Sequence, residues 1–183
     1  MKKIISVVLC LALSFSLTAP VFATDTGEIQ GPIHEILYGE DELARAATFP
    51  SANSYYNLGA GNYYIATIPD LAPTKTTFTR YYFSTPTESM YLKLNFEHSG
   101  LSSDLHRMIT VELWHVLTPG TEGTLHDSRT IAYSSTPDTW NLSFRGLEKN
   151  DFYYVRFKNI SSTNVGDGKT ISGKCTISDT SIS

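Results

Sequence analysis

The sequence predicts an all-β protein, specifically an antiparallel, jelly-roll-like β-sandwich of eight or nine strands. From Ser51 onward, short runs rich in Tyr, Phe, Thr, Val and Ile are separated by Gly, Pro, Asn, Asp and Ser, which is the pattern of strands joined by turns. No amphipathic helical pattern interrupts these runs, so a sheet of alternating strands and helices is disfavoured. Several runs alternate between apolar and polar residues, as strands do when one face packs on a core and the other meets water.

Eight strands follow from these runs, and residues 55–58 are a possible ninth. The predicted strands are 62–68, 76–84, 90–97, 108–117, 129–134, 140–145, 152–159 and 170–178. We interpret the two longest irregular segments, 117–127 and 159–169, as end loops of the sandwich, where binding residues are commonly placed.

Alternation also predicts which side chains of a strand face the core. Residues two apart share a face of a strand, and by this rule Tyr154 and Arg156 face away from the core. The predicted core-facing sets are Leu92, Leu94 and Phe96; Ile109, Val111 and Leu113, continued by His115; Trp140, Leu142 and Phe144; and Tyr153, Val155 and Phe157.

The N-terminus has the pattern of a secretory signal peptide. Lys2 and Lys3 precede an apolar stretch over 4–17, and Val21-Phe22-Ala23 supplies residues that a signal peptidase accepts. The apolar stretch is short for a membrane span of ~20 residues. We therefore predict cleavage after Ala23 and a secreted, extracellular protein with no membrane anchor after cleavage.

The number of cysteines is consistent with an exported protein that has no disulfide bond. We associate exported proteins of this kind with bacteria. Once the signal peptide is removed, Cys175 is the only cysteine, so no internal disulfide can form. We interpret Cys175 as a small buried residue of a strand.

The charge distribution divides the remaining chain into an acidic leader and a nearly neutral body. Residues 24–47 contain six acids and one base, whereas 12 acids face 11 bases from Thr48 onward. We predict a signal peptide at 1–23, a flexible leader at 24–50 and one β-sandwich domain at 51–183. The body lacks the concentrated basic surface that nucleic-acid binding requires, so no nucleic-acid partner is expected.

Motifs for catalysis, metals and cofactors are missing from the sequence. Gly166 to Thr170 ends like a phosphate-binding loop, but it lacks the earlier glycine and the following helix. No Gly-x-Ser-x-Gly elbow and no short-spaced zinc ligands occur. We predict a protein that is not an enzyme and has no catalytic residues, no cofactor and no metal.

Four segments resemble the pre-peptidase C-terminal domains of bacterial secreted enzymes. Phe152 to Phe157 is similar to the closing aromatic-Val-Arg region of that family, and Arg80 to Ser84 is similar to its early aromatic strand. Met90 to Phe96 and Ile109 to Val116 match the next strand and the central strand. The resemblance covers about residues 76–178 and implies a small jelly-roll-like sandwich with a role in binding or secretion. Where the family's central strand commonly begins with an Asp-x-Asp-Leu segment that helps to hold calcium, this chain has Arg107 to Val111, so calcium is not implied.

The tyrosines give the strongest indication of function. Eleven are present, several as Tyr-Tyr pairs, and in a strand such a pair places one ring inside and one outside. Outward rings gathered on one sheet would form a platform for sugar rings, although tyrosine is also simply a good strand former. The candidate ligand-binding residues are Tyr154, Arg156, Tyr82 and Tyr63.

The predicted function is therefore a secreted, non-enzymatic binding module for an extracellular or cell-surface ligand, either a glycan or a protein. One alternative is a secreted enzyme or enzyme inhibitor with dispersed loop residues, which predicts a cleft that gathers His106, Asp104 or Glu112. The other alternative is a structural protein of an envelope or spore coat.

Overall fold

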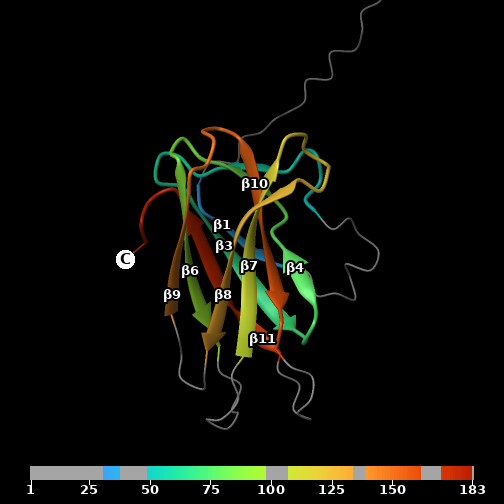
Figure 1. The fold of residues 1–183 in the computed structure, drawn as a ribbon. Helices are drawn as coiled ribbons and strands as arrows, with labels where there is room; N and C mark the ends of the chain where they lie inside the picture. The colour runs from blue at the N-terminus through green and yellow to red at the C-terminus, as the bar shows by residue number, and fades with distance from the viewer. Residues whose placement is uncertain (1–30, 38–48, 98–106, 134–138, 162–169, 183) are drawn as a thin grey trace, which may run out of the picture.

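The chain folds into two β-sheets stacked face to face, which confirms the predicted all-β sandwich (Figure 1). The computed structural model describes residues 31–37, 49–97, 107–133, 139–161 and 170–182, and within them every regular element is a strand. The predicted signal peptide at 1–23 and the loop residues 98–106 lie outside the described residues.

Each sheet combines strands from distant parts of the chain. In space, the first sheet (sheet A) runs β1 (Ile33–Ile36), β3 (Tyr63–Leu71), β11 (Ile171–Ser178), β6 (Ser89–Phe96) and β9 (Thr139–Arg145). The second (sheet B) runs β2 (Tyr55–Asn57), β5 (Tyr82–Ser84), β10 (Phe152–Asn159), β7 (Arg107–Val116) and β8 (Thr124–Tyr133), and β4 (Thr76–Phe78) also pairs with β10.

The sheets are mixed rather than wholly antiparallel. The pairs β1–β3 and β2–β5 are parallel, and the other pairs are antiparallel. Parallel neighbours need a crossover connection, and β2 reaches β5 through β3, which belongs to the opposite sheet. Period-two alternation reports faces but not strand direction, so the sequence could not reveal these two pairs.

The structure has eleven strands, and the additional ones have local causes. The predicted strand 76–84 is divided into β4 and β5, while the possible ninth strand is β2. Strand β8 begins at Thr124, inside the segment predicted as a loop. Most of its side chains are polar and exposed on both faces, so the sequence there lacks the apolar alternation that marks a strand.

Strand β1 corrects the prediction of a flexible leader over 24–50. It pairs with β3 at the edge of sheet A, and Leu37 just beyond it is buried in the core. The inward-facing residues of this segment are Ile33, Glu35 and Leu37. Because Glu35 is charged, the segment lacks the regular apolar–polar alternation that predicts a strand. Residues 24–30 and 38–48 of the predicted leader lie outside the described residues.

The core between the sheets follows the predicted alternation. Val155 and Phe157 are fully buried, and the predicted apolar counterparts on β6 and β7 are buried as well. His115, predicted to continue the core face of β7, is only partly buried. Trp140 shares the inward face of β9 but is 36% exposed, because β9 is the edge strand of sheet A. Cys175 is fully buried, and burial raises the pKa of its thiol.

A buried carboxylate makes the docking of β1 sensitive to pH. Burial is the main cause that raises the pKa of Glu35 to about 7, which the Arg80 guanidinium opposes. Arg80 Nε lies 3.4 Å from Glu35 Oε1, an ion-pair distance without the alignment of a hydrogen bond. The folded state therefore holds the Glu35 proton more tightly than the unfolded state, and stability falls as the pH rises from about 4.5 to about 7.

Replacing Glu35 with Gln should remove this pH dependence. The full shift corresponds to about 3 kcal/mol, but Arg80 is half exposed and solvent screens the pair, so we expect Glu35→Gln to stabilise the fold by about 1 to 2 kcal/mol at pH about 8. The gain should vanish near pH 4.5. Chemical denaturation across this range measures it, with the exposed Glu97→Gln as control; a gain that is independent of pH would contradict the prediction.

Candidate functional site

The outward-facing side chains of sheet A form rows that cross its strands. Register pairs Ser178 of β11 with Tyr63 on one side and with Tyr91 on the other, and Tyr91 pairs in turn with Ser143. Directly paired residues lie on the same face of a sheet. This first row is followed by a second and a third. The second consists of His34, Ile65, Thr176, Lys93 and Asn141, and the third of Ile36, Thr67, Lys174, Asn95 and Thr139.

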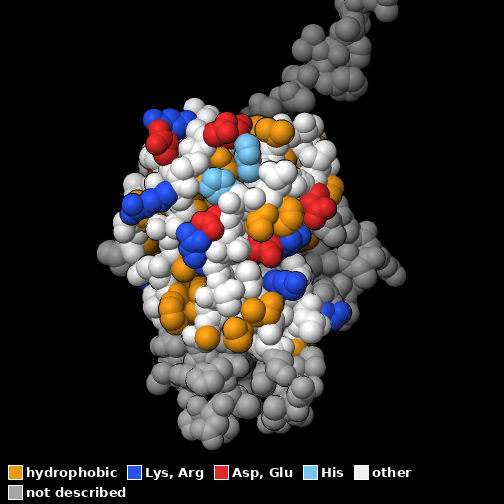
Figure 2. All heavy atoms as spheres, viewed as in Figure 1, with side chains coloured by type: hydrophobic (Ala, Val, Ile, Leu, Met, Phe, Trp, Pro, Cys, Tyr) orange, Lys and Arg blue, Asp and Glu red, His pale blue; other side chains and the backbone are white. Residues whose placement is uncertain are grey.

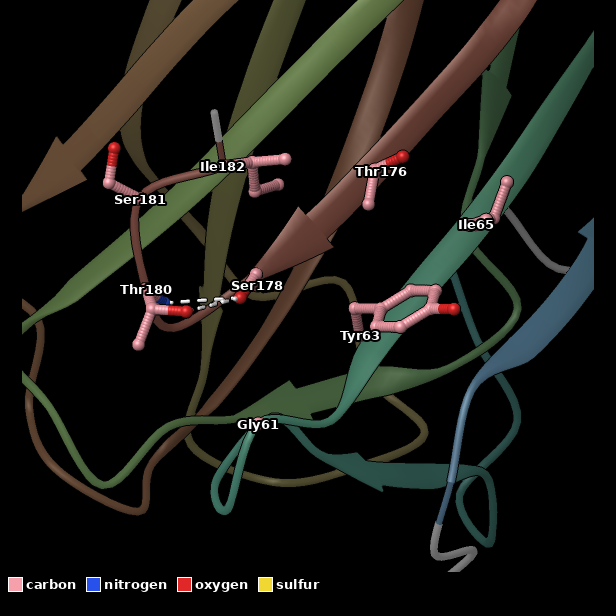
Figure 3. Close-up of a pocket in the computed structure, with 8 residues that line it drawn as sticks. All are labelled: Gly61, Tyr63, Ile65, Thr176, Ser178, Thr180, Ser181 and Ile182. Atoms are coloured by element: carbon pink, nitrogen blue, oxygen red, sulfur yellow. Dashed lines mark hydrogen bonds between the residues drawn. The ribbon is translucent and has the colours of Figure 1, made fainter.

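A pocket of about 350 Å³ lies on this face, at the end where the first row stands. Figure 3 shows the Tyr63 ring projecting from β3 on one side, and the chain that follows β11 curving back on the other. We call it the Tyr63 pocket; its lining residues are Gly61, Tyr63, Ile65, Thr176, Ser178, Thr180, Ser181 and Ile182. Tyr63 is 39% exposed, so its side chain is open to a ligand.

Hydrogen bonds fix the wall that follows β11. Thr180 donates its backbone N–H to Ser178 Oγ over 3.1 Å, and the two hydroxyl oxygens are 3.2 Å apart (Figure 3). When a serine hydroxyl accepts a hydrogen bond from the backbone N–H two residues later, the chain forms a compact local turn. The chain is therefore turned back over the sheet, and its hydroxyls are held at the pocket.

The opposite wall is positioned by a turn and by a core residue. Between β2 and β3 the backbone takes positive φ at Ala60 (60°) and Gly61 (79°), and the chain reverses there. The buried Tyr56 places its hydroxyl 2.7 Å from the Tyr63 carbonyl oxygen, to which it can donate. Tyr63 is thus fixed at its backbone while its ring stays outside.

The lining of the pocket is chemically suited to a polyhydroxylated ligand. One aromatic ring supplies an apolar surface, and the lining includes four hydroxyl groups, on Thr176, Ser178, Thr180 and Ser181. Thr180 and Ser181 are exposed and Thr176 is half-buried, whereas Ser178 is buried and its hydroxyl is bonded to Thr180. None of the lining residues that the structure describes has a charged side chain. Such a lining places hydrogen-bond donors and acceptors beside one aromatic surface.

The outer face of sheet B is different, because its aromatic side chains pack on one another. Tyr82, Val116 and Tyr154 are fully buried there, under partly buried neighbours. Tyr82 Oη donates to the Pro50 carbonyl over 2.7 Å and accepts from the Gly120 N–H over 2.9 Å. The segments around Pro50 and Gly120 therefore cover the rings. The partly buried neighbours are Phe49, Tyr55, Phe78, Trp114 and Phe152.

Arg156 is held in the same cluster by charge and by an aromatic face. Its Nε donates to Glu112 Oε2 over 2.6 Å, and its guanidinium carbon lies 3.9 Å from the centre of the Trp114 ring. Trp114 Nε1 donates to the same carboxylate oxygen over 3.0 Å, and its ring stacks on Tyr154. Trp114 and Arg156 are thereby occupied within the protein.

The four candidate residues from the sequence fall on two different sheets. Tyr82, Tyr154 and Arg156 come together on sheet B, whereas Tyr63 lies on sheet A. Tyr82 and Tyr154 are fully buried, so neither can offer its ring to a ligand, which corrects their prediction as binding residues. Tyr154 does face away from the core between the sheets, but other side chains cover it. Burial also raises the pKa of the Tyr154 phenol, whose oxygen has no hydrogen-bond partner among the described residues. Of the three predicted rings, only the ring of Tyr63 is positioned to contact a ligand.

Two residues of the pocket floor, Thr176 and Ser178, did not stand out in the sequence. Their strand was predicted, but its position between β3 and β6 depends on long-range pairing. A serine two positions before a threonine at a strand end, as Ser178 and Thr180 are, was the available local signal.

The residues proposed for the enzyme alternative are not gathered at the described surface. Glu112 is engaged by Arg156, while Asp104 and His106 lie outside the described residues. His115 Nε2 is 2.7 Å from Asp151 Oδ2, but no hydroxyl or thiol of the described residues is bonded to this histidine.

Figure 2, with β7, β8 and β10 toward the viewer, shows hydrophobic side chains in several separate patches among charged and polar groups. Nor do three or more His, Cys, Asp or Glu side chains of the described residues meet as metal ligands.

Comparison with known proteins gives similarity at the level of structure alone. Neither a protein-family model nor a curated protein matches the sequence. One similar solved structure is described as "CBM4 structure and function", with 13% identity, a TM-score of 0.28, and coverage of 64% of this chain and 57% of that one. A second is a β-glucosidase from Paenibacillus barengoltzii, with 14% identity, a TM-score of 0.35, and coverage of 81% of this chain and 13% of that one. The resemblance to pre-peptidase C-terminal domains stays a prediction.

No helix suited to crossing a membrane occurs among the residues that the structure describes.

Proposed function

We propose that this protein is a secreted, non-enzymatic glycan-binding module whose binding site is the Tyr63 pocket. The observation that carries the proposal is an exposed tyrosine beside hydroxyl side chains of β11 and of the chain that follows it, which together line one pocket. Sugar rings present an apolar face of C–H groups and a rim of hydroxyls, so they match an aromatic ring next to polar donors and acceptors.

The pocket is bounded on both sides across the strands. Tyr63 stands on β3, the floor is formed by β11, and the chain that follows β11 forms the opposite wall (Figure 3). A glycan in the pocket would therefore lie between the Tyr63 ring and the hydroxyl-bearing wall.

A glycan is favoured over a protein ligand by the chemistry of the pocket. Stable protein interfaces are built around buried apolar anchors, and the Tyr63 pocket offers one half-exposed ring among hydroxyls. Extracellular action rests on the predicted signal peptide.

Removing the Tyr63 ring is the direct test. We expect Tyr63→Ala to weaken binding to a responsive glycan at least about tenfold, because the stacking surface and its buried area are lost. Tyr63→Phe keeps the ring and should retain most of the affinity. Titration calorimetry of the purified protein with soluble neutral oligosaccharides from cellulose, xylan, mannan and chitin, together with pull-down on cell-wall polysaccharide, measures the effect.

The control variant is Trp140→Ala, which removes an aromatic ring of similar exposure outside the pocket. It should leave glycan affinity unchanged. Equal losses in Tyr63→Ala and Trp140→Ala, or no binding to any glycan, would contradict the proposed site.

A further inference from the structure

We propose that two copies of this chain associate through the outer edge of β9, as antiparallel strands that join their A sheets into one continuous sheet. The proposal goes beyond the proposed function, because it concerns a second surface and a different partner. Its basis is a comparison of the sheet edges and the pattern of residues along β9.

The two sheets end in four strands in the part of the chain that the structure describes, β1 and β9 in sheet A and β2 and β8 in sheet B. An exposed edge presents unpaired backbone N–H and C=O groups, and proteins protect it with short strands, charges or bulges. Strand β1 has four residues and a carboxylate at Glu35, and β2, like β4 beside β10, has three residues. Strand β8 carries Asp127 and Arg129, and its register with β7 shifts between Leu113 and Trp114. These edges are therefore protected.

Strand β9 has none of these protective features. Its seven residues, Thr139–Arg145, include no charge before Arg145 and no proline, and they keep one continuous register with β6. Its inward side is also incompletely covered, since Trp140 is 36% exposed and Leu142 is only partly buried. A further strand at this edge would pair the free backbone groups and extend the cover over both side chains.

The sequence of β9 is suited to pairing with a second copy of itself. Directly opposed residues of an antiparallel pair lie on the same face of the sheet, and a two-fold axis at Leu142 lets all seven residues overlap. The opposed residues of the two copies are then Thr139 with Arg145, Trp140 with Phe144, Asn141 with Ser143 and Leu142 with Leu142. Apolar residues therefore meet on the inward face, polar residues meet on the outward face, and no like charges are opposed.

This pairing places the Tyr63 pockets of both copies on one sheet face. The two-fold axis is perpendicular to the sheet, so the outward faces of the two copies point the same way. Seven inter-strand spacings separate the two β3 strands, roughly 34 Å. Where the proposed function holds, a polysaccharide can occupy both pockets and gain avidity, whereas a soluble oligosaccharide occupies one pocket.

The association should be weak, because the interface is small. A single pair of seven-residue strands lies at the low end of interface sizes, and we expect a dissociation constant on the order of 10 to 100 µM. Sedimentation velocity of the full mature chain from about 1 µM to about 500 µM, with no glycan present, measures it. A chain that is monomeric throughout this range overturns the proposal and leaves the proposed glycan site standing.

A matched pair of charge variants assigns the dimer to β9. Thr139→Arg opposes a like charge to Arg145 of the second copy, and the symmetry repeats this pair, so dimerisation should weaken at least about threefold. Thr139→Glu opposes an unlike charge and should strengthen dimerisation about threefold. Both variants lose the same hydrogen bond, from the Thr139 hydroxyl to Asn95 Oδ1, so their difference reports charge. In ~0.5 M salt the difference should shrink to about twofold or less.

Thr130→Arg is the control, because it adds the same charge at the edge strand of the other sheet. Thr130 is an exposed residue of β8, and its hydroxyl contacts that of Thr110. This variant should leave the dissociation constant unchanged. Equal weakening by Thr139→Arg and Thr130→Arg, or equal dissociation constants for Thr139→Arg and Thr139→Glu, would mean that the copies meet elsewhere, and either result overturns the role of β9.

Discussion

The variant Gly173→Ala should lose about 3 kcal/mol of unfolding free energy, a large effect for the addition of one methyl group. A Cβ at Gly173 would lie 2.4 Å from the Asn95 carbonyl oxygen and 3.0 Å from Phe96 Cα. Both are backbone atoms of β6, so no side chain can rotate away to make room. The methyl group fits only if β11 moves apart from β6, which lengthens the hydrogen bonds between the two strands.

Gly61→Ala is the matched control for this prediction. Gly61 has a φ of +79°, but a Cβ added there would meet no atom within 4 Å, so its replacement costs only backbone strain, about 1 kcal/mol. Urea denaturation of the two variants compares crowding with strain directly. Equal losses would mean that β11 and β6 separate easily. Because β11 forms the pocket floor, Gly173→Ala should also weaken glycan binding, if it folds.

The parts of the fold that were predictable depend on local pattern. The inward positions of β6 and β10, such as Leu92 and Val155, follow from alternation, which reports the face of a strand whatever its neighbours are. Strand β1 escaped prediction because Glu35, a charged residue, occupies an inward position.

The candidate site was less predictable, because it depends on which strands become neighbours. Tyr63 was identified from its strand, but its position beside Ser178 requires β11 to lie between β3 and β6. Tyr154 shows the opposite failure. Its predicted face is correct, since Tyr153 and Val155 face the core, yet segments from elsewhere in the chain bury it. Parity predicts the side of a sheet, whereas exposure also depends on what covers that side.

A second large effect is expected at Tyr56, which joins the core to the pocket. Its side chain is fully buried, and its ring meets Phe83 edge-on with 6.3 Å between centroids. The hydroxyl lies 2.6 Å from the Gly31 carbonyl oxygen and 2.7 Å from that of Tyr63. Tyr56→Ala should cost about 3 to 5 kcal/mol, because it leaves a cavity and removes the hydroxyl whose single hydrogen the two carbonyls share.

Tyr56→Phe separates these two contributions, since it keeps the ring and removes only the hydroxyl. We expect a loss of about 1 to 2 kcal/mol, with weaker glycan binding as well, because the backbone of Tyr63 loses the hydrogen bond that fixes it. The control is Tyr81→Phe; this tyrosine also packs on the core, but its hydroxyl makes no hydrogen bond to a described residue. Its unfolding free energy should change by less than about 0.5 kcal/mol. Tyr56→Phe could instead lose stability but keep full affinity for the glycan. The hydrogen bond to the Tyr63 carbonyl would then not be needed to position the Tyr63 ring, and the turn at Gly61 alone would hold the aromatic wall of the pocket.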